Sequence, residues 1–487
     1  MGLRKSISAG ATATERGLPA GTKGRCVTLT VRASRKWSTP ASSERVEAIS
    51  SRFGISSEAE DVVVLDGVRI QLKPGHLILI QGPSGVGKSL LLQELSRRCP
   101  HSRFVNRVTF RSDKCLVEQI LPGAPLGEAV HLLTGCAMGE PRLWLRRFHE
   151  LSDGEQFRAR LARSISLQAA DGKWEPLLCD EFCAQLGRRA AKAVAFNLRR
   201  QVNRLGLCAV VATTHDDLEA DLQPDRVVRM IAPGCHTVEE PEPQVRPMSL
   251  SRRMHIEPGR CADYRKFAPM HYRRRDELGF VDRVFIMRDG VRGEKVGIVL
   301  YAHAPLELAL RNKATQGRFI RNAVRLNREL RILRRLVIDP ELRGCGLGSL
   351  LVRKTLPLVG TRFVECLANM GDLVPVFQRA GMERIGQCPL PKSMLRVEAD
   401  LQSLGAAPMT PEFAAQVGRR PRVRRLVAQV IYRWYCGLTN SQAARRRVER
   451  QSAEKLAQSY RQLRGSRPVY FLWERSAGAV QQQRAAG

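Results

Sequence analysis

The feature that most restricts the fold of this chain is a glycine loop between an apolar segment and a helix-like one. The loop reads "GPSGVGKS" at 82–89, with "HLILI" before it and "SLLLQELSRRC" after it. In such a loop, backbone N–H groups surround phosphate oxygens at the point where a strand runs directly into a helix. Strands and helices keep alternating as far as residue 215, which predicts an α/β fold with a mainly parallel sheet.

Each residue of the loop is a candidate ATP ligand: Gly82, Pro83, Ser84, Gly85, Val86, Gly87, Lys88 and Ser89. Lys88 is expected to reach the β- and γ-phosphate oxygens, and the Ser89 hydroxyl is expected to bind Mg²⁺. The sequence therefore predicts ATP and Mg²⁺ as cofactors.

Two later apolar strands end in polar side chains suited to the same phosphates. "LLCDE" ends in Asp180, expected to hold Mg²⁺, and Glu181, a carboxylate that can polarise the attacking water. "VVATTH" ends in His215, whose imidazole is expected to contact the γ-phosphate. The order and spacing of these groups predict ATP hydrolysis.

The segment "LSDGE" at 151–155 makes the prediction more specific. It resembles the signature motif of ABC-type ATPases, so this part of the chain looks like one ABC nucleotide-binding domain. The resemblance implies a homodimer with ATP between the glycine loop of one subunit and Ser152, Gly154 and Glu155 of the other.

The chain also departs from the ABC pattern. Gly187, in "CAQLG", stands where the family usually has Asp, and Gln119 is only a candidate for the expected Q-loop glutamine. The two phosphate motifs lie close together in sequence, which leaves a short helical subdomain. Because that subdomain couples transporters to their membrane partner, its reduction argues against a transporter.

A second glycine loop, "RGCGLG" at 343–348, lies between the strand "RILRRLVID" and the helix "GSLLVRKTL". Backbone N–H groups at a helix N-terminus can bind a pyrophosphate, and glycines allow its close approach. With the strand "RFVECLA" and the helix "VPVFQRAGM", the region resembles the GNAT acyltransferase core over about 260–395. The acetyl-CoA ligands implied by the resemblance are Leu336, Val337, Ile338, Arg343, Gly344, Cys345, Gly346, Leu347, Gly348 and Ser349.

Acyl transfer to an amine also needs a proton acceptor. Glu365, on the strand after the loop, is the first candidate for this base, and His303, His271 and Tyr272 are alternatives. Phe377 stands where the family often has the Tyr that protonates the leaving thiolate, so that role is vacant or has moved.

The net charge of +33 points to a polyanionic partner. Residues 1–250 contain 35 Lys and Arg against 27 Asp and Glu, whereas residues 251–487 contain 45 against 20. The candidate nucleic-acid contacts are Arg311, Lys313, Arg318, Arg321, Arg325 and Arg328. At steps of three and four, residues 318–328 are expected to line one helix face, which suits phosphate backbones.

The expected domains are a basic disordered arm (1–45), an ABC-type ATPase domain (46–231), a linker (232–250), a GNAT-like domain (251–398) and a basic helical extension (399–487). In the extension, Tyr432, Trp434 and Tyr435 serve either as base-stacking groups or as helix core. No apolar run approaches the ~20 residues of a membrane span. Scattered single cysteines indicate a reducing cytoplasm.

Together these features predict ATP-regulated acyl transfer from CoA to an amine on a nucleic acid or modified base. Two alternatives remain open. One is acetylation of a protein or small amine, with the ATPase as a switch. The other is a nucleic-acid clamp whose GNAT fold has lost catalysis.

Overall fold

The computed structural model describes residues 26–37, 43–55, 60–171, 174–242, 247–271, 278–436, 442–465 and 467–475. They form two compact units that do not follow chain order. Unit 1 comprises Met1–Leu278, Arg283–Leu300 and Arg335–Lys354. Unit 2 comprises Gly279–Asp282, Tyr301–Arg334 and Thr355–Gly487. Among the described residues, no helix is long and apolar enough to span a bilayer.

The first glycine loop belongs to a six-stranded sheet of order β4-β5-β6-β3-β7-β8. Its strands are β3 (Leu77–Gln81), β4 (Arg103–Phe104), β5 (Leu177–Cys179), β6 (Ala209–Thr213), β7 (Arg226–Ala232) and β8 (Cys235–Glu239). All neighbouring strands are parallel except β7 and β8. Both β3 and β6 are buried along their whole length, as their apolar runs predicted.

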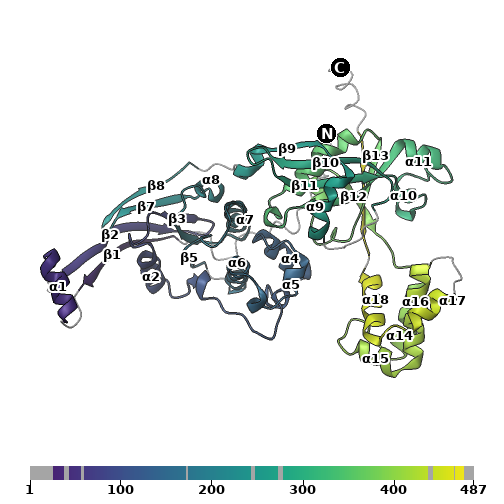
Figure 1. The fold of residues 1–487 in the computed structure, drawn as a ribbon, viewed down its shortest axis with the longest axis horizontal. Helices are drawn as coiled ribbons and strands as arrows, with labels where there is room; N and C mark the ends of the chain where they lie inside the picture. The colour runs from purple at the N-terminus through teal and green to yellow at the C-terminus, as the bar shows by residue number, and fades with distance from the viewer. Residues whose placement is uncertain are drawn as a thin grey trace, which may run out of the picture. The chain divides into compact units, whose positions relative to one another are not determined.

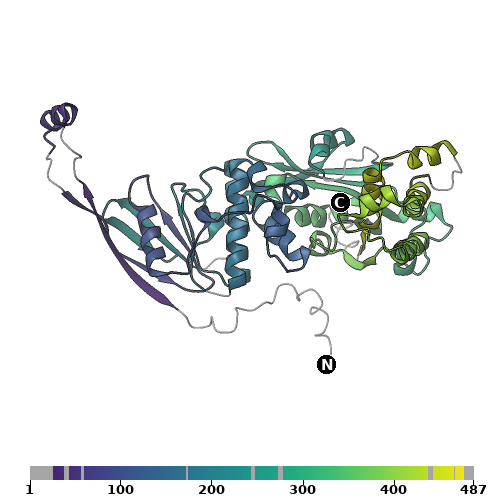
Figure 2. The same ribbon diagram turned by 90° about the horizontal axis from the view of Figure 1, so that it is seen from below.

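The helices of this part are α2 (Lys88–Arg98), α3 (Leu116–Gln119), α4 (Leu126–Gly135), α5 (Pro141–Trp144), α6 (Asp153–Asp171), α7 (Arg188–Leu205) and α8 (Glu219–Leu222). A hairpin of β1 (Val27–Trp37) and β2 (Glu60–Leu72) precedes the sheet in sequence. Helix α1 (Glu44–Phe53) lies between these two strands in the chain, at the tip of the hairpin (Figures 1 and 2). Val31 and Ile70 from the hairpin join Ile80, Leu92 and other buried residues in one core.

Two expected domain boundaries are wrong in this region. Residues 27–37 form β1, not disordered arm, because they pair along their length with β2; the arm's first 25 residues lie outside the described part. The linker also begins later than expected, because Cys235–Glu239 pairs with β7 as β8.

The second glycine loop belongs to a seven-stranded sheet of order β14-β15-β13-β12-β11-β10-β9. Its strands are β9 (Met254–Pro258), β10 (Val281–Asp289), β11 (Lys295–Ala302), β12 (Leu330–Ile338), β13 (Phe363–Ala368), β14 (Glu383–Gln387) and β15 (Val469–Glu474). Strands β12 and β13 are parallel, whereas β15 is antiparallel to both β13 and β14. The helices in this region are α9 (Tyr264–Phe267), α10 (Ala309–Ala314), α11 (Ala323–Glu329), α12 (Leu347–Thr355) and α13 (Val376–Arg379).

The expected C-terminal extension is instead an insertion. Five helices, gathered in one cluster in Figure 1, separate β14 from β15. They are α14 (Lys392–Ser403), α15 (Phe413–Arg419), α16 (Pro421–Cys436), α17 (Gln442–Glu449) and α18 (Ala453–Gly465). They share a core of their own that includes Phe413, Val427 and Tyr460. The chain then returns to the sheet as β15, so the insertion is anchored at both ends.

Candidate functional sites

The first glycine loop has the geometry of a phosphate site. The loop follows β3 and ends where α2 begins at Lys88, so the first-turn N–H groups of α2 face the loop. Ser84 and Gly85 are exposed at the tip of the loop. Gly82 is required because a Cβ there would lie 2.2 Å from the Met230 carbonyl oxygen on β7.

The Lys88 ammonium lies inside the loop and donates hydrogen bonds to the carbonyls of Gly82 (2.8 Å) and Pro83. Burial lowers the pKa of Lys88, and the nearby Asp180 and Glu181 carboxylates oppose this shift. The lysine, the two carboxylates and the loop therefore share one site.

Parallel strands bring the remaining candidates to the same edge of the sheet, because β3, β5 and β6 all end there. Asp180 and Glu181 follow β5, and the Asp180 carboxylate accepts a hydrogen bond from the Glu181 N–H at 3.0 Å. Glu181 has a φ of 50°, a left-handed conformation that non-glycine residues adopt at a cost.

His215 follows β6 and is held by the strand next to it. Its N–H donates to the Thr213 hydroxyl (3.2 Å), and its carbonyl accepts from the Gln81 amide (3.0 Å). Burial is the main cause that lowers the pKa of His215, which favours a neutral imidazole.

Asn106 is a site residue that the sequence analysis missed. It comes just after β4, which runs parallel to β5, and its amide donates to the Asp180 carbonyl at 3.3 Å. Its side-chain oxygen is of the type that Mg²⁺ accepts. The only signal in the sequence was its place after a two-residue strand.

Gln119, in contrast, is buried and serves a structural role. Its amide oxygen accepts from the Arg111 N–H, and its amide nitrogen donates to the Arg111 and Lys114 carbonyls. These bonds occupy both ends of the amide, so the structure does not favour Gln119 as a Q-loop residue.

The signature segment starts α6. The Glu155 carboxylate accepts from the Ser152 N–H (2.9 Å), and Ser152 itself is exposed. A Cβ on Gly154 would lie 2.9 Å from Leu186, in the "CAQLG" segment that follows Glu181. The signature segment is therefore packed against the segment that leads from Asp180 and Glu181 into α7.

The second glycine loop also lies between a strand and a helix. The register of β12 with β13 ends at the Leu333–Cys366 pair, although β12 continues to Ile338. The loop enters α12, whose first-turn N–H groups have no partner within the helix. Gly346 is exposed, and a Cβ there would meet no atom within 4 Å. The loop is thus open at Gly346.

The other side of this loop packs against the part of unit 1 that contains the first glycine loop. Arg343 donates to the Gly139 carbonyl (3.0 Å), and Arg200 on α7 donates to the Gly344 carbonyl (2.9 Å). The Cys345 thiol lies 3.6 Å from the Asn197 amide nitrogen, also on α7. Burial raises the pKa of Cys345 to about 12, so its thiol stays protonated at neutral pH.

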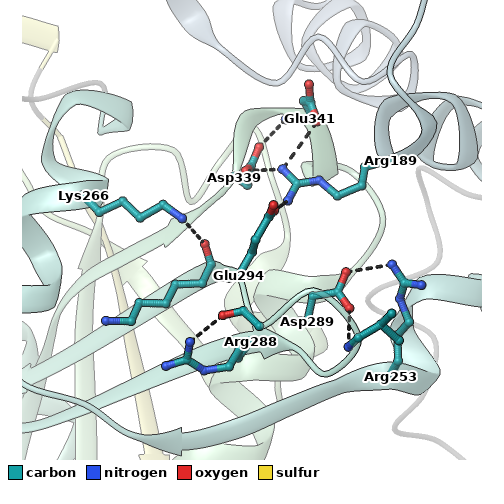
Figure 3. Close-up of polar contacts among 11 residues, drawn as sticks. Arg189, Arg253, Lys266, Arg288, Asp289, Glu294, Asp339 and Glu341 are labelled. Carbon is teal, nitrogen blue, oxygen red and sulfur yellow. Dashed lines mark hydrogen bonds and ion pairs between the residues drawn. The ribbon is translucent and has the colours of Figure 1, made fainter.

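Arg189, near the start of α7, binds the acidic side chains around the strand ends that precede the loop. Its guanidinium lies 2.8 Å from the Asp339 carboxylate and 3.5 Å from that of Glu341, and it also pairs with Glu294 (Figure 3). Its neighbour Arg188 pairs instead with Asp217, just after His215. One helix end therefore contacts both the segment that follows His215 and the segment that precedes the second loop.

Glu365 is poorly suited to be the base. Its side chain is fully buried and accepts two hydrogen bonds from Arg311, at 2.8 and 2.9 Å, and one from the Tyr470 hydroxyl at 2.9 Å. Arg311 is also fully buried, so the prediction that it contacts phosphate is wrong. Phe377 packs against Phe471, with ring centroids 5.4 Å apart.

Of the alternative bases, His303 is exposed, and its Nδ1 lies 3.3 Å from the Asn327 amide oxygen. Tyr272 lies outside the described residues, and His271 lies at the end of one of the described ranges. His303 therefore remains a candidate.

The expected arginine stripe does not lie on one helix. Helix α11 begins at Ala323, after Asn322 caps it, so Arg318 and Arg321 lie in the turns before it. Arg318, Arg325 and Arg328 all pair with Glu329. These contacts, the Arg318 hydrogen bond first, lower the pKa of Glu329 to about 2. Of the six, Lys313 and Arg321 are exposed and form no ion pair with the described residues.

No group of three or more His, Cys, Asp or Glu side chains suited to a metal occurs in the described ranges. In the inserted helices, Tyr432 packs against the helical core, whereas Trp434 is 46% exposed. The Tyr435 side chain lies outside the described part.

The glycine loop, the Asp180–Glu181 pair, His215 and the signature segment define the nucleotide-binding domain of an ABC-type ATPase. Curated relatives agree. The chain is 27% identical over 207 residues to the lipoprotein-releasing system ATP-binding protein LolD of Paramagnetospirillum magneticum, covering 35% of this chain and 88% of the relative. It is 26% identical over 216 residues to the LolD of Novosphingobium aromaticivorans, covering 37% and 92%.

A third relative is the spermidine/putrescine import ATP-binding protein PotA of Bacteroides thetaiotaomicron, 28% identical over 214 residues, with 38% of this chain and 44% of the relative covered. No protein-family model matches the chain. The chain thus contains an ATP-binding ABC ATPase domain, and most of its length lies outside the match.

Proposed function

We propose that this protein is an ATP-controlled acyltransferase that acts as a homodimer on an amine of a nucleic acid. The observation that carries the acyltransferase part is the seven-stranded sheet, in which a glycine loop and helix connect the parallel strands β12 and β13. This is the arrangement expected from the GNAT resemblance. Acyl-CoA would supply the thioester, and the loop from Arg343 to Ser349 would hold its pyrophosphate.

The residues around the loop support binding at this place. The end of β12 is free of β13 beyond Leu333, which leaves Leu336–Ile338 for the pantetheine arm. Gly346 is open to a pyrophosphate, and the helix N-terminus behind it favours negative charge.

The contacts of α7 support control by ATP. Residues 189, 193, 197 and 200 recur at steps of three or four, so they lie on one face of the helix. From this face Arg189 binds the Asp339 carboxylate, and Arg200 binds the Gly344 carbonyl. The Asn197 amide nitrogen on the same face contacts the Cys345 thiol. Because α7 begins right after the "CAQLG" segment, a shift there on ATP binding would reach the loop.

A second candidate function is a nucleic-acid clamp without acyl transfer. The observation that favours it is the burial of Glu365 by Arg311 and Tyr470, together with the Phe at 377. These features remove two of the groups that acyl transfer usually needs.

One experiment separates these functions. The full chain is incubated with labelled acetyl-CoA, total nucleic acid and total protein, with and without ATP and Mg²⁺. The proposal predicts label in the nucleic acid that depends on ATP. Label found in protein alone would contradict the proposal that the acceptor is a nucleic acid. If nothing is labelled but the chain still binds nucleic acid, the result would favour the clamp.

Gly344→Ala is expected to weaken binding of CoA at least about tenfold, measured by calorimetry. Gly344 has a φ of 89°, and a Cβ would lie 2.4 Å from the Thr134 carbonyl oxygen of the backbone, so the loop must move. Gly360→Ala is the matched control, because its φ is also 89° but a Cβ meets no atom within 4 Å. Equal CoA affinity in the two variants would contradict the assignment of this loop.

Arg189→Ala is expected to leave ATP hydrolysis intact but to remove its effect on acyl transfer. Its loss releases Asp339, Glu294 and Glu341 from α7. Coupling between sites is typically worth 5- to 150-fold, so the ratio of label with and without ATP should fall from that range to about one. The exposed Arg142→Ala on α5 is the control. A ratio unchanged in Arg189→Ala would rule out this route.

A further inference from the structure

We propose that the exposed face of α16 in the inserted helices binds the phosphate backbone of duplex nucleic acid. The inference deepens the nucleic-acid part of the proposed function and rests on it. It moves the phosphate-binding surface from the segment 311–328, where the sequence pattern placed it, to the insertion between β14 and β15.

The insertion carries much of the chain's excess charge. Residues 391–465 contain 15 Lys and Arg against 5 Asp and Glu. A surface with this balance attracts a polyanion over the Debye length of about 10 Å at 0.1 M salt. The helices of the insertion are held by an apolar core, so the charged side chains are presented on a folded scaffold.

Helix α16 separates its charges from its core with helical spacing. Val423, Val427 and Ile431 are buried in the core of the insertion. Arg422, Arg425, Gln429 and Arg433 are exposed and recur at steps of three and four, so they form one row. Arg422 and Arg433 are eleven helical steps apart, which places the two ends of this row about 16 Å from each other.

The guanidinium groups of this row are available, whereas in 311–328 only Arg321 has no ion pair with the described residues. In the part of the chain that the structure describes, Arg422, Arg425 and Arg433 have no carboxylate partner. In contrast, Arg311 is fully buried and forms an ion pair with Glu365. Three further arginines of that segment form ion pairs with Glu329. An unpaired guanidinium can bind phosphate without first losing an ion pair.

Neighbouring arginines extend the basic surface. Arg419 and Arg420 precede α16 and are exposed, as are Arg446, Arg447 and Arg450 in and after α17, whereas Arg445 pairs with Glu449. Helices α16 and α17 pack against each other. The row itself contains no aromatic side chain, so it offers cations for phosphates but no platform for unstacked bases, which favours a duplex over a single strand.

The test is binding of the full chain to a labelled 20-base-pair DNA duplex over a series of salt concentrations. The triple variant Arg422→Gln, Arg425→Gln and Arg433→Gln removes three charges and keeps good helix formers. Affinity scales with salt to a power of about −0.9 for each phosphate contact. We expect the slope to become shallower by two to three, and binding at 0.1 M salt to weaken about 10²- to 10³-fold.

The matched control is Arg318→Gln, Arg325→Gln and Arg328→Gln, which removes the same charge from arginines that pair with Glu329. It should change the slope by less than one. If the control weakens binding as much as the α16 variant, net charge alone explains the effect and the inference is wrong. An unchanged thermal midpoint of the α16 variant confirms that its helix is intact.

Two further results separate this inference from the proposed function. If the wild-type chain binds the duplex and the α16 variant binds it equally well, the assignment to α16 is wrong, whereas the proposal of a nucleic-acid acceptor is unaffected. A wild-type chain with no salt-dependent binding to any nucleic acid would overturn both. If the wild-type chain binds a single strand of the same length as tightly as the duplex, and the α16 variant loses this binding, the assignment to a duplex is wrong.

Discussion

Lys88→Ala is expected to reduce ATP hydrolysis by about 10²- to 10³-fold, the usual effect of removing one group that stabilises a transition state. Lys88 lies within the loop and donates to the Gly82 and Pro83 carbonyls. When ATP binds, its ammonium is the group able to exchange these carbonyls for β- and γ-phosphate oxygens. Alanine has no donor to replace it.

The measurement is phosphate release by the full chain with Mg²⁺ and saturating ATP. The control is Lys313→Ala, an exposed lysine in unit 2, which should leave the rate unchanged. Under the proposed function, the Lys88 variant should also label nucleic acid to the same extent with and without ATP. A hydrolysis rate close to that of the control variant would contradict the ATP site built here.

Glu365→Ala is expected to lower the free energy of unfolding by about 3 to 5 kcal/mol, because it leaves the buried Arg311 guanidinium without its partner. Both side chains are fully buried, and the pair forms two hydrogen bonds at 2.8 and 2.9 Å. The Tyr470 hydroxyl loses its acceptor as well. The change is measured by urea unfolding followed by circular dichroism.

Glu474→Ala on the neighbouring strand β15 is the matched control. Glu474 pairs with Arg362 at 2.7 Å, but both side chains are about half exposed, so its loss should cost about 0 to 1 kcal/mol. The double variant Arg311→Met and Glu365→Met should recover most of the loss, because two apolar groups can replace a buried pair. A Glu365→Ala chain as stable as the Glu474 control would show that the buried pair does not hold this part together.

The position of Lys88, Asp180, Glu181 and His215 at one edge of the sheet could be predicted from the sequence. Lys88, Asp180, Glu181 and His215 each follow an apolar strand, and parallel strands end at one edge, so their proximity is a consequence of local patterns. Asn106 escaped prediction because its strand has only two residues, too short for a periodic signal. The role of Gln119 could not be predicted, because the sequence does not reveal whether a side-chain amide forms hydrogen bonds with the backbone around it.

The region after residue 390 could be predicted only in part. The apolar spacing of this region predicts its helices, but the sequence of the short strand Val469–Glu474 does not indicate which strands it pairs with. It joins β13 and β14 across the whole insertion, a pairing that depends on residues about a hundred positions away. A helical extension and a helical insertion therefore have the same local sequence pattern.

Local sequence patterns were enough to predict the two glycine loops and the strands and helices around them, because hydrogen bonding and apolar periodicity act over a few residues. Which arginines are free of ion pairs could be learned only from the packing of distant segments. Arg311 meets Glu365 54 positions away, and Arg189 meets Asp339 150 positions away, whereas Arg422, Arg425 and Arg433 face outward from a helix. The availability of an arginine depends on which carboxylate the fold brings within about 4 Å, and that distance is set by packing between distant segments.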